Sequence, residues 1–206
     1  MHLLFALIVA SQAPSAASDT THLVIVATTD VHGRVRGWDY VRDVEAPGGL
    51  SRAATILETL RTQYPGRLVL VDAGDLLQGN PFATFFGRPD QRTPQPIVDA
   101  LNALQYDAAT PGNHDFDFGL PLLRRAGVEA TYHYVAANVD QTSGGPLFPA
   151  TVVLQRAGVR VGITGFTTPG VMVWDRAQLA GQIKVRRVAE AAPAALAQLE
   201  REGANV

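Results

Sequence analysis

The stretch ATPGNHDFDFG, Ala109 to Gly119, gathers several polar residues into a short segment. It places Asn113, His114 and Asp117 between a Pro-Gly pair and a closing glycine. Gly, Pro, Asn and Asp are frequent in tight turns, because they tolerate or preset unusual backbone angles. Taken alone, the stretch predicts a turn, and a role in an active site needs support from the rest of the chain.

Segments upstream of this stretch alternate between strand and helix patterns. Residues 22–30 (HLVIVATTD) and 67–75 (RLVLVDAGD) are apolar runs that end in carboxylates, as expected for strands buried on both faces. Residues 48–66 carry apolar side chains at helical spacing and end in Pro-Gly. A further helix is predicted near residues 95–104, before a short strand that leads into residue 113. This order predicts a layered α/β domain.

The second half of the sequence predicts a strand over residues 132–139 and a hairpin over residues 150–166, with its turn at Ala157-Gly158. Residues 188–203 predict a helix that is entered or interrupted at Pro193 and capped by Gly203. Residues 204–206 are expected to begin another strand.

Three of the predicted strands deliver polar residues at their carboxyl ends: DVHG, GD and GNHD. Open α/β sheets bind ligands at this edge, so these loops are expected to converge. In extended backbone Asp30 and His32 point the same way and can hold one cation. Asp75 can bridge two cations, and Asn113 offers a neutral oxygen ligand. Each motif alone is typical of a solvated turn, but their joint occurrence indicates a metal site.

Composition limits the possible partners and ligands. The 206 residues are 47% hydrophobic and 17% charged, which is typical of a globular domain. A net charge of -2 provides no broad basic surface, so long nucleic acid is not expected as a partner. The absence of cysteine leaves His, Asp, Glu and Asn as metal ligands.

The N-terminal residues predict an export signal over residues 1–17. An apolar run from Leu3 to Ala10 is followed by small residues, with Ser15 and Ala17 placed as a cleavage site. The run is too short to span a bilayer, so no membrane association is expected after cleavage. The expected location is therefore periplasmic or secreted. The alternatives are a misassigned start and a buried first strand.

Several motifs together resemble one known family, over about residues 23–206. TTDVHG, LVDAGDLLQGNP, PGNHDFDFG, ANV and GITGFTTP are similar to motifs of the calcineurin-like metallophosphoesterases, specifically the exported 5′-nucleotidase family. GWDYVRD, GLSRAATIL, NALQYDAATPGNHDFDFG and VMVWDRAQLAG resemble the branch of 2′,3′-cyclic-nucleotide 2′-phosphodiesterase/3′-nucleotidases more than the strict 5′-nucleotidases. The resemblance implies a four-layer αββα sandwich, apparently truncated.

The resemblance also implies two divalent metal ions, which can be Mn, Zn, Fe, Co or Mg. Asp30 and His32 would bind the first ion, Asp75 would bridge, and Asn113 would bind the second. His114, oriented and charged by Asp117, would stabilise the transition state and assist the leaving oxygen. A hydroxide activated by the two metals would attack the phosphorus of a nucleotide or another small phosphoester, without a covalent phospho-enzyme.

Other candidate residues have simpler explanations. His2, His22 and His133 are expected to be structural or incidental. Trp38 and Tyr40 can stack on a base, but partial burial against the first helix is the expected role for them, and partial burial is also expected for Trp174.

The resemblance covers only part of the family's catalytic domain. Family members complete the metal pair with histidines from two later loops, HxG-like and GHxH-like, and this sequence has no histidine after His133. We therefore expect residues 18–206 to form the N-terminal part of that domain, weak or inactive by itself, with the C-terminal part missing. The alternatives are a phosphoesterase for a non-nucleotide ester and a truncated remnant that binds a metal or partner without turnover.

Overall fold

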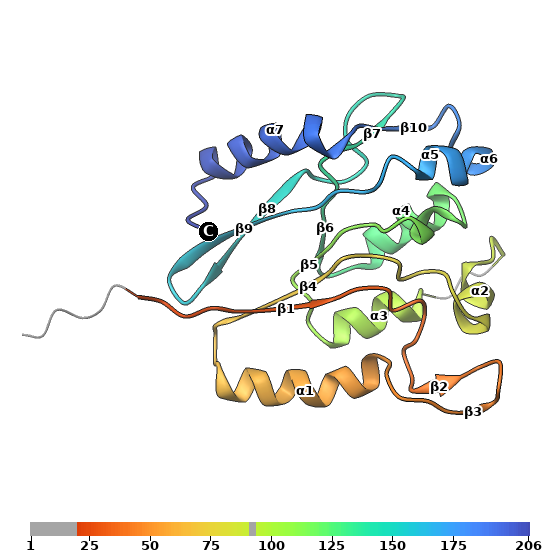
Figure 1. The fold of residues 1–206 in the computed structure, drawn as a ribbon, viewed down its shortest axis with the longest axis horizontal. Coiled ribbons are helices and arrows are strands. Elements are labelled where there is room, and N and C mark those ends of the chain that lie inside the picture. The colour runs from red at the N-terminus through yellow and green to blue at the C-terminus, as the bar shows by residue number, and fades with distance from the viewer. Residues whose placement is uncertain (1–19, 91–93) are drawn as a thin grey trace, which may run out of the picture.

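A parallel four-stranded sheet lies at the centre of the computed structural model, which describes residues 20–90 and 94–206. Its strand order is β1-β4-β5-β6 (Figure 1). The strands are β1 (Val24–Thr28), β4 (Leu68–Asp72), β5 (Ala108–Ala109) and β6 (His133–Tyr134). Val24 pairs with Leu68 and Val71 with Ala108, so all strands point their carboxyl ends to one edge. The predicted signal segment, residues 1–17, lies outside the described residues.

Three helices cover one face of this sheet and form the main core with it. They are α1 (Leu50–Gln63), α3 (Pro96–Ala103) and α4 (Leu120–Glu129). Leu57, Leu101 and Leu123 are buried in the same cluster as Leu70 of β4. The apolar faces of the helices thus pack against the leucine-rich strand β4. This packing fixes the position of the carboxyl ends of the strands.

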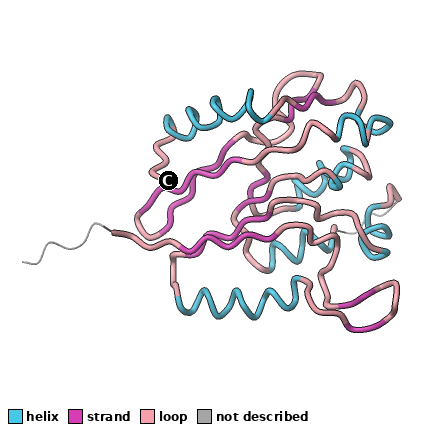
Figure 2. The backbone as a smooth tube through the Cα atoms, in the orientation of Figure 1, coloured by secondary structure: helices cyan, strands magenta, loops and turns pink. Residues whose placement is uncertain are grey.

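A hairpin packs on the opposite face of the sheet. It consists of β8 (Thr151–Arg156) and β9 (Val159–Thr164), paired antiparallel, and is covered in turn by α7 (Val188–Arg201). Figure 2 shows strands in the middle and helices on both outer sides. The Arg156 guanidinium joins the two β layers by donating to the Leu68 carbonyl at 3.0 Å. The four-layer αββα arrangement is therefore confirmed.

The remaining elements are short and lie around the ends of the layers. They are β2 (Trp38–Asp39), β3 (Val44–Glu45), α2 (Pro81–Gly87), the 3₁₀ turn η1 (His114–Phe116), β7 (Val139–Gln141), α5 (Val171–Trp174), α6 (Arg176–Leu179) and β10 (Ile183–Val185). β2 pairs with β3, and β7 with β10. Among the described residues, no helix has the length and apolar character needed to cross a membrane.

The structure corrects three expectations from the sequence. β1 is not buried on both faces, because Ile25 is 65% exposed at the partly covered edge of the sheet. The single strand predicted over residues 132–139 is two strands, since Val135 bonds to β5 and Ala137 bonds to Gly165 beyond β9. α7 runs continuously through Pro193, and its buried residues Ala191, Ala195 and Leu199 offset the one missing backbone bond.

The last three residues form no regular strand, although one was predicted to begin there, but they hydrogen-bond to β9. Gly162 N–H donates to the Val206 carbonyl at 2.8 Å, and Asn205 N–H donates to the Arg160 carbonyl at 2.7 Å. After α7 the chain therefore turns back and runs along the second β layer.

Candidate metal centre

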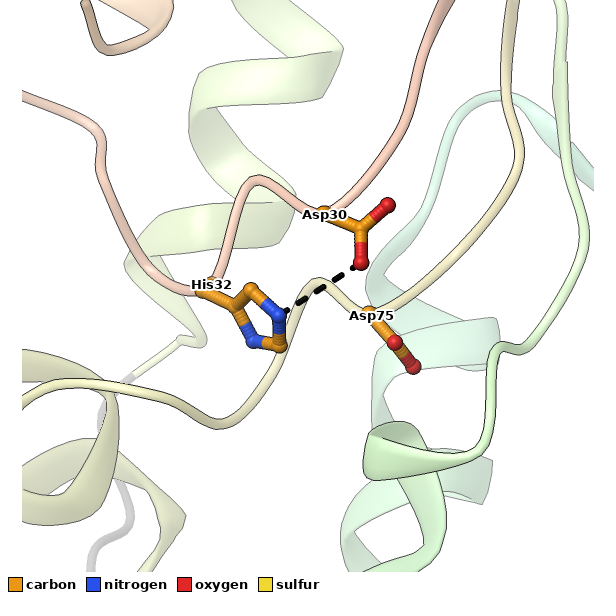
Figure 3. Close-up of side chains that lie close together, drawn as sticks. All are labelled: Asp30, His32 and Asp75. Carbon is orange, nitrogen blue, oxygen red and sulfur yellow. Dashed lines mark ion pairs between the residues drawn. The ribbon is translucent and has the colours of Figure 1, made fainter.

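Two predicted ligands after β1 and one after β4 form a compact cluster. Asp30, His32 and Asp75 each offer a ligand atom within 4.8 Å of the other two (Figure 3). The His32 Nε2 atom lies 3.6 Å from Asp30 Oδ1, and the Asp75 side chain lies beside them. The predicted convergence of these loops at the edge of the sheet is seen in the structure.

The backbone brings these ligands together in an unexpected way. Asp30, His32 and Asp75 have φ values of 53°, 48° and 59°, in the left-handed region, so the extended backbone assumed for Asp30 and His32 is wrong. Residues with side chains rarely adopt this conformation, and each instance costs about 1–3 kcal/mol. Backbone bonds between the two loops hold it: Asp30 N–H donates to the Gly74 carbonyl at 3.0 Å, and His32 N–H to the Asp75 carbonyl at 2.8 Å.

A backbone carbonyl orients the imidazole of His32. The His32 Nδ1 atom lies 2.8 Å from the Gln78 carbonyl oxygen, which can only accept a hydrogen bond. Nδ1 must therefore carry the proton, which leaves the Nε2 lone pair facing Asp30 and Asp75. A Cβ on Gly79 would lie 2.6 Å from the same ring, so this glycine is required for the close approach.

A buried carboxylate that was not assigned a role from sequence ties the loops after β4 and β5 together. Asp115 accepts backbone N–H bonds from Asp75 at 2.9 Å and from Leu76, Leu77 and Gly112 at 2.8 Å each. Burial raises the pKa of Asp115 to about 6, and the backbone donors act in the opposite direction. Asp115 therefore sets the position of Asp75 without belonging to the cluster itself.

Asp72 is a second supporting carboxylate, at the end of β4. It accepts from the Thr28 hydroxyl at 2.5 Å and from Gly74 N–H at 2.7 Å, and Thr28 in turn lies 2.8 Å from the Tyr106 hydroxyl. Burial raises the pKa of Asp72 to about 7. In the sequence, this supporting role is indicated by an aspartate at the end of an otherwise apolar strand.

Glycines allow the loops after β4 and β5 to touch. A Cβ on Gly74, which has φ of 97°, would lie 2.1 Å from the Gly112 backbone nitrogen. A Cβ on Gly112 would lie 2.2 Å from Asp75 Oδ1. Asp75 Oδ1 also accepts the His114 N–H at 2.8 Å, so the contact positions the third loop directly against the cluster.

The stretch from Ala109 to Gly119 contains the 3₁₀ turn η1. Asn113 has φ of −70° and ψ of −39°, and its carbonyl accepts from Phe116 N–H at 3.3 Å, so the extended backbone assumed for Asn113 and His114 is wrong. Asn113 directly precedes the residue that bonds to Asp75. Its role as a ligand of a second ion stays a prediction.

His114 and Asp117 form the predicted pair. His114 Nδ1 lies 3.1 Å from Asp117 Oδ2, and the His114 ring centroid is 5.4 Å from that of His32. The hydrogen bond to Asp117 raises the pKa of His114, which favours the protonated imidazole. The His114 side chain is 42% exposed, so it remains accessible beside the cluster.

Trp38 and Tyr40 are partly buried, as expected. Tyr40 stacks on Phe82 of α2, with centroids 6.1 Å apart. The Arg36 guanidinium lies over Trp38 at 4.6 Å. Trp174, expected to be partly buried, is 65% exposed.

The chemistry of the cluster fits a divalent cation. Two carboxylates and one imidazole are ligands that suit Mg, Mn, Fe and Zn, and a cation would relieve the repulsion between Asp30 and Asp75. The prediction of a metal ligand group is thus supported by geometry for one ion, whereas the second ion and the identity of either metal stay predictions.

Comparison with known families matches residues 23–170 to the calcineurin-like phosphoesterase family. The chain belongs to this family. Calcineurin-like phosphoesterases use divalent metals, which agrees with the cluster of Asp30, His32 and Asp75.

Its relatives are nucleotide phosphoesterases of greater length. The trifunctional nucleotide phosphoesterase protein YfkN of Bacillus subtilis is 38% identical over 94% of this chain, which covers 14% of that protein. A 2′,3′-cyclic-nucleotide 2′-phosphodiesterase/3′-nucleotidase of Yersinia enterocolitica is 35% identical over 98% of this chain and 33% of its own length. The chain therefore spans about a third or less of these relatives.

A solved structure shows the same fold. The crystal structure of the calcineurin-like phosphoesterase YfkN from Bacillus subtilis matches with a TM-score of 0.83 at 36% identity. The match covers 89% of this chain and 60% of that one. The described layers and the carboxyl-edge loops therefore belong to a known family architecture.

Proposed function

We propose that this protein takes part in the metal-dependent hydrolysis of nucleotide phosphoesters, with two divalent ions. The observation that carries the proposal is the cluster of Asp30, His32 and Asp75 directly beside the His114–Asp117 pair. The names of relatives at 35% and 38% identity support nucleotides as the substrate class.

The proposal assigns roles to the residues of the centre. Asp30 and His32 would hold one ion, Asp75 would hold both, and Asn113 would hold the other. When bound, the ions would neutralise phosphate oxygens and lower the pKa of an attacking water.

His114 would act on the side of the leaving oxygen. With Asp117 accepting from Nδ1, the Nε2 atom is free to donate a hydrogen bond or a proton. The hydrogen bond to Asp117 raises the pKa of His114, which favours the protonated imidazole that can donate from Nε2. The chain thus supplies charge stabilisation and a proton at one defined atom.

Within nucleotides, we propose that 2′,3′-cyclic nucleotides and 3′-nucleotides are accepted at least as readily as 5′-nucleotides. The Yersinia enterocolitica relative is 35% identical, whereas the 5′-nucleotidase of Vibrio vulnificus is 26% identical. Comparison of kcat/KM on 2′,3′-cyclic AMP, 3′-AMP and 5′-AMP tests this preference. A strong preference for 5′-AMP would contradict it.

The function itself is tested by phosphate release from the full-length protein with Mn²⁺ and Zn²⁺, alongside metal content. Turnover of nucleotides with about two bound metals is the expected result. Turnover of p-nitrophenyl phosphate but not of nucleotides would favour a non-nucleotide ester as substrate, and metal binding without turnover would favour the non-catalytic remnant.

Export stays a prediction, which N-terminal sequencing of the mature protein would check.

A further inference from the structure

The segment after β9 packs against the loop after β5 that leads into His114. A Cβ on Gly165 would lie 2.5 Å from the Thr110 side chain, so the two segments approach without room for a further carbon atom. Two residues later, the Thr167 hydroxyl donates to the Pro111 carbonyl at 2.8 Å, and Thr167 is only 1% exposed. Both residues of this segment belong to GITGFTTP, a motif to which the proposed metal chemistry assigns no role.

The peptide unit between Pro111 and Gly112 is held from two sides. Its carbonyl accepts from the Thr167 hydroxyl, and its N–H donates to the Asp115 carboxylate at 2.8 Å. Because a peptide unit is planar, hydrogen bonds to its carbonyl and to its N–H together fix its orientation. Asp115 holds this peptide from within the loop after β5, whereas Thr167 holds it from the segment after β9.

The side chain of Asn138 fixes Thr167 in turn. Asn138 Oδ1 accepts the Thr167 N–H at 3.0 Å, and Asn138 Nδ2 donates to the Thr167 carbonyl at 2.7 Å. Nδ2 also donates to the Arg186 carbonyl at 2.8 Å, just after β10. Asn138 is buried, so Thr167 cannot turn away from Pro111 without leaving buried polar groups unpaired.

The peptide held by Thr167 directly precedes the candidate catalytic residues. A Cβ on Gly112 would lie 2.2 Å from Asp75 Oδ1, and the same oxygen accepts the His114 N–H at 2.8 Å. Asn113 lies between these two contacts in the sequence. A rotation of the Pro111–Gly112 peptide would therefore displace this part of the loop relative to the metal cluster.

We propose that Thr167 is a positioning residue whose hydroxyl, held in place by Asn138, fixes the loop that presents Asn113 and His114 to the metal cluster. Thr167 acts through the Pro111 carbonyl, so its loss should change kcat rather than KM. The effect on turnover rests on the proposed phosphoester hydrolysis, whereas the effect on the position of the loop does not.

Substitutions of Thr167 separate the hydroxyl from the shape of the side chain. Thr167→Val keeps the branched shape and removes the donor, and Thr167→Ser keeps the donor. In the full-length protein, we expect Thr167→Val to lower kcat on 2′,3′-cyclic AMP about ten- to a hundredfold, because small displacements of catalytic groups have effects of this size. KM should stay within about twofold in Thr167→Val, and Thr167→Ser should keep kcat within about threefold of the wild type.

Thr151→Val is the matched control. Thr151, in β8, is also buried, and its hydroxyl donates to Glu202 Oε2 at 3.0 Å. Thr151→Val should lower Tm, as Thr167→Val does, but leave kcat unchanged. If Thr167→Val does not fold, Thr167→Cys, whose thiol is only a weak donor, takes its place and should lose more activity than Thr167→Ser.

Two kinetic results would overturn the proposal. An unchanged kcat in Thr167→Val, or in Thr167→Cys where that variant is used, would show that the hydroxyl contributes to stability alone. An equal loss of kcat in Thr167→Ser would assign the effect to packing of the Thr167 methyl group.

A second measurement does not depend on turnover. In metal-free, full-length protein labelled with ¹⁵N at histidine, the backbone amide of His114 is identified by its loss in His114→Ala. This amide donates to Asp75 Oδ1, so its proton resonance reports the position of the loop. The resonance should shift in Thr167→Val and stay unchanged in Thr167→Ser and Thr151→Val.

An unchanged His114 amide resonance in Thr167→Val would overturn the positioning role. If the wild type hydrolyses none of the nucleotides, the proposed function fails, and the NMR comparison still decides the role of Thr167.

Discussion

The β8–β9 turn and the metal centre both use left-handed backbone, but for different purposes. In the turn, Ala157 and Gly158 have φ values of 49° and 80°, and a Cβ on Gly158 would meet nothing within 4 Å. In the metal centre, the left-handed residues are Asp30, His32 and Asp75, whose side chains converge. Glycine or asparagine in place of Ala157 would lower the backbone strain of the turn. The metal centre, in contrast, needs the side chains of its strained residues.

The two regions hold their strained backbone in different ways. A two-residue hairpin needs positive φ only to reverse the chain, and any residue that tolerates it serves. The loops after β1 and β4 hold strained residues through mutual backbone bonds, such as His32 N–H to the Asp75 carbonyl at 2.8 Å. Backbone strain at residues that carry candidate metal ligands therefore indicates a functional site, whereas the strain of the hairpin turn does not.

The largest expected effect is on Asp75, the residue that both proposed ions share. Asp75→Asn should reduce kcat by about a thousandfold or more, because several kcal/mol of metal-dependent charge stabilisation are lost. The fold should survive, since the asparagine oxygen can still accept the His114 N–H. Phosphate release and metal content measure the effect, with Asp140→Asn, which pairs with Arg186 away from the centre, as the control. Near-normal metal content and turnover would contradict a bridging role.

A pair of glycines tests the comparison directly. Gly74→Ala should lower the free energy of unfolding by about 3 kcal/mol, because the new Cβ combines positive φ with a clash against Gly112. Gly158→Ala adds a Cβ in open space at positive φ and should cost only about 1 kcal/mol. Urea denaturation of both variants measures the difference. Equal losses would mean that the close contact between the two loops is unimportant.

His114 tests whether the exposed member of the centre acts on the reaction rather than on the metals. His114→Ala should lower kcat about a hundredfold, the usual scale for a general acid, while about two metals stay bound. His133→Ala, at the exposed residue of β6, is the matched control and should change neither quantity. Loss of one metal equivalent in His114→Ala would identify His114 as a ligand instead.

The smallest expected effect concerns the hairpin turn. Ala157→Asn should raise the free energy of unfolding by about 0.5 kcal/mol, because Asn-Gly favours a two-residue turn with two positive φ values. Thermal melting detects such a gain, and turnover should not change. A decrease in Tm would show that Ala157 is not strained in solution.

Local sequence patterns predicted the elements whose side chains repeat regularly. The apolar spacing of residues 48–66 predicted α1, and the turn at Ala157-Gly158 predicted the β8–β9 hairpin, because both depend on neighbours in the sequence. Asp30, His32 and Asp75 were predicted to converge because parallel strands end at one edge of the sheet.

Features that depend on contacts between distant segments were not predicted. The left-handed backbone of Asp30 requires a bond to Gly74, which lies in another loop. Asp115 stands within the stretch that suggested a metal site, yet its role depends on the amides of residues 75–77. The change of sheet after residue 135 follows from pairing partners, not from the apolar pattern of residues 132–139.

The four amides bound by Asp115 have a consequence for local opening. If the loop after β4 separated from the loop after β5, the buried Asp115 carboxylate would lose all its amide donors from residues 75–77. Exchange of these amides with deuterated solvent should therefore occur in one concerted step, together with that of Gly112. A metal ion that arrives at this edge would meet loops that are already locked as one cooperative unit.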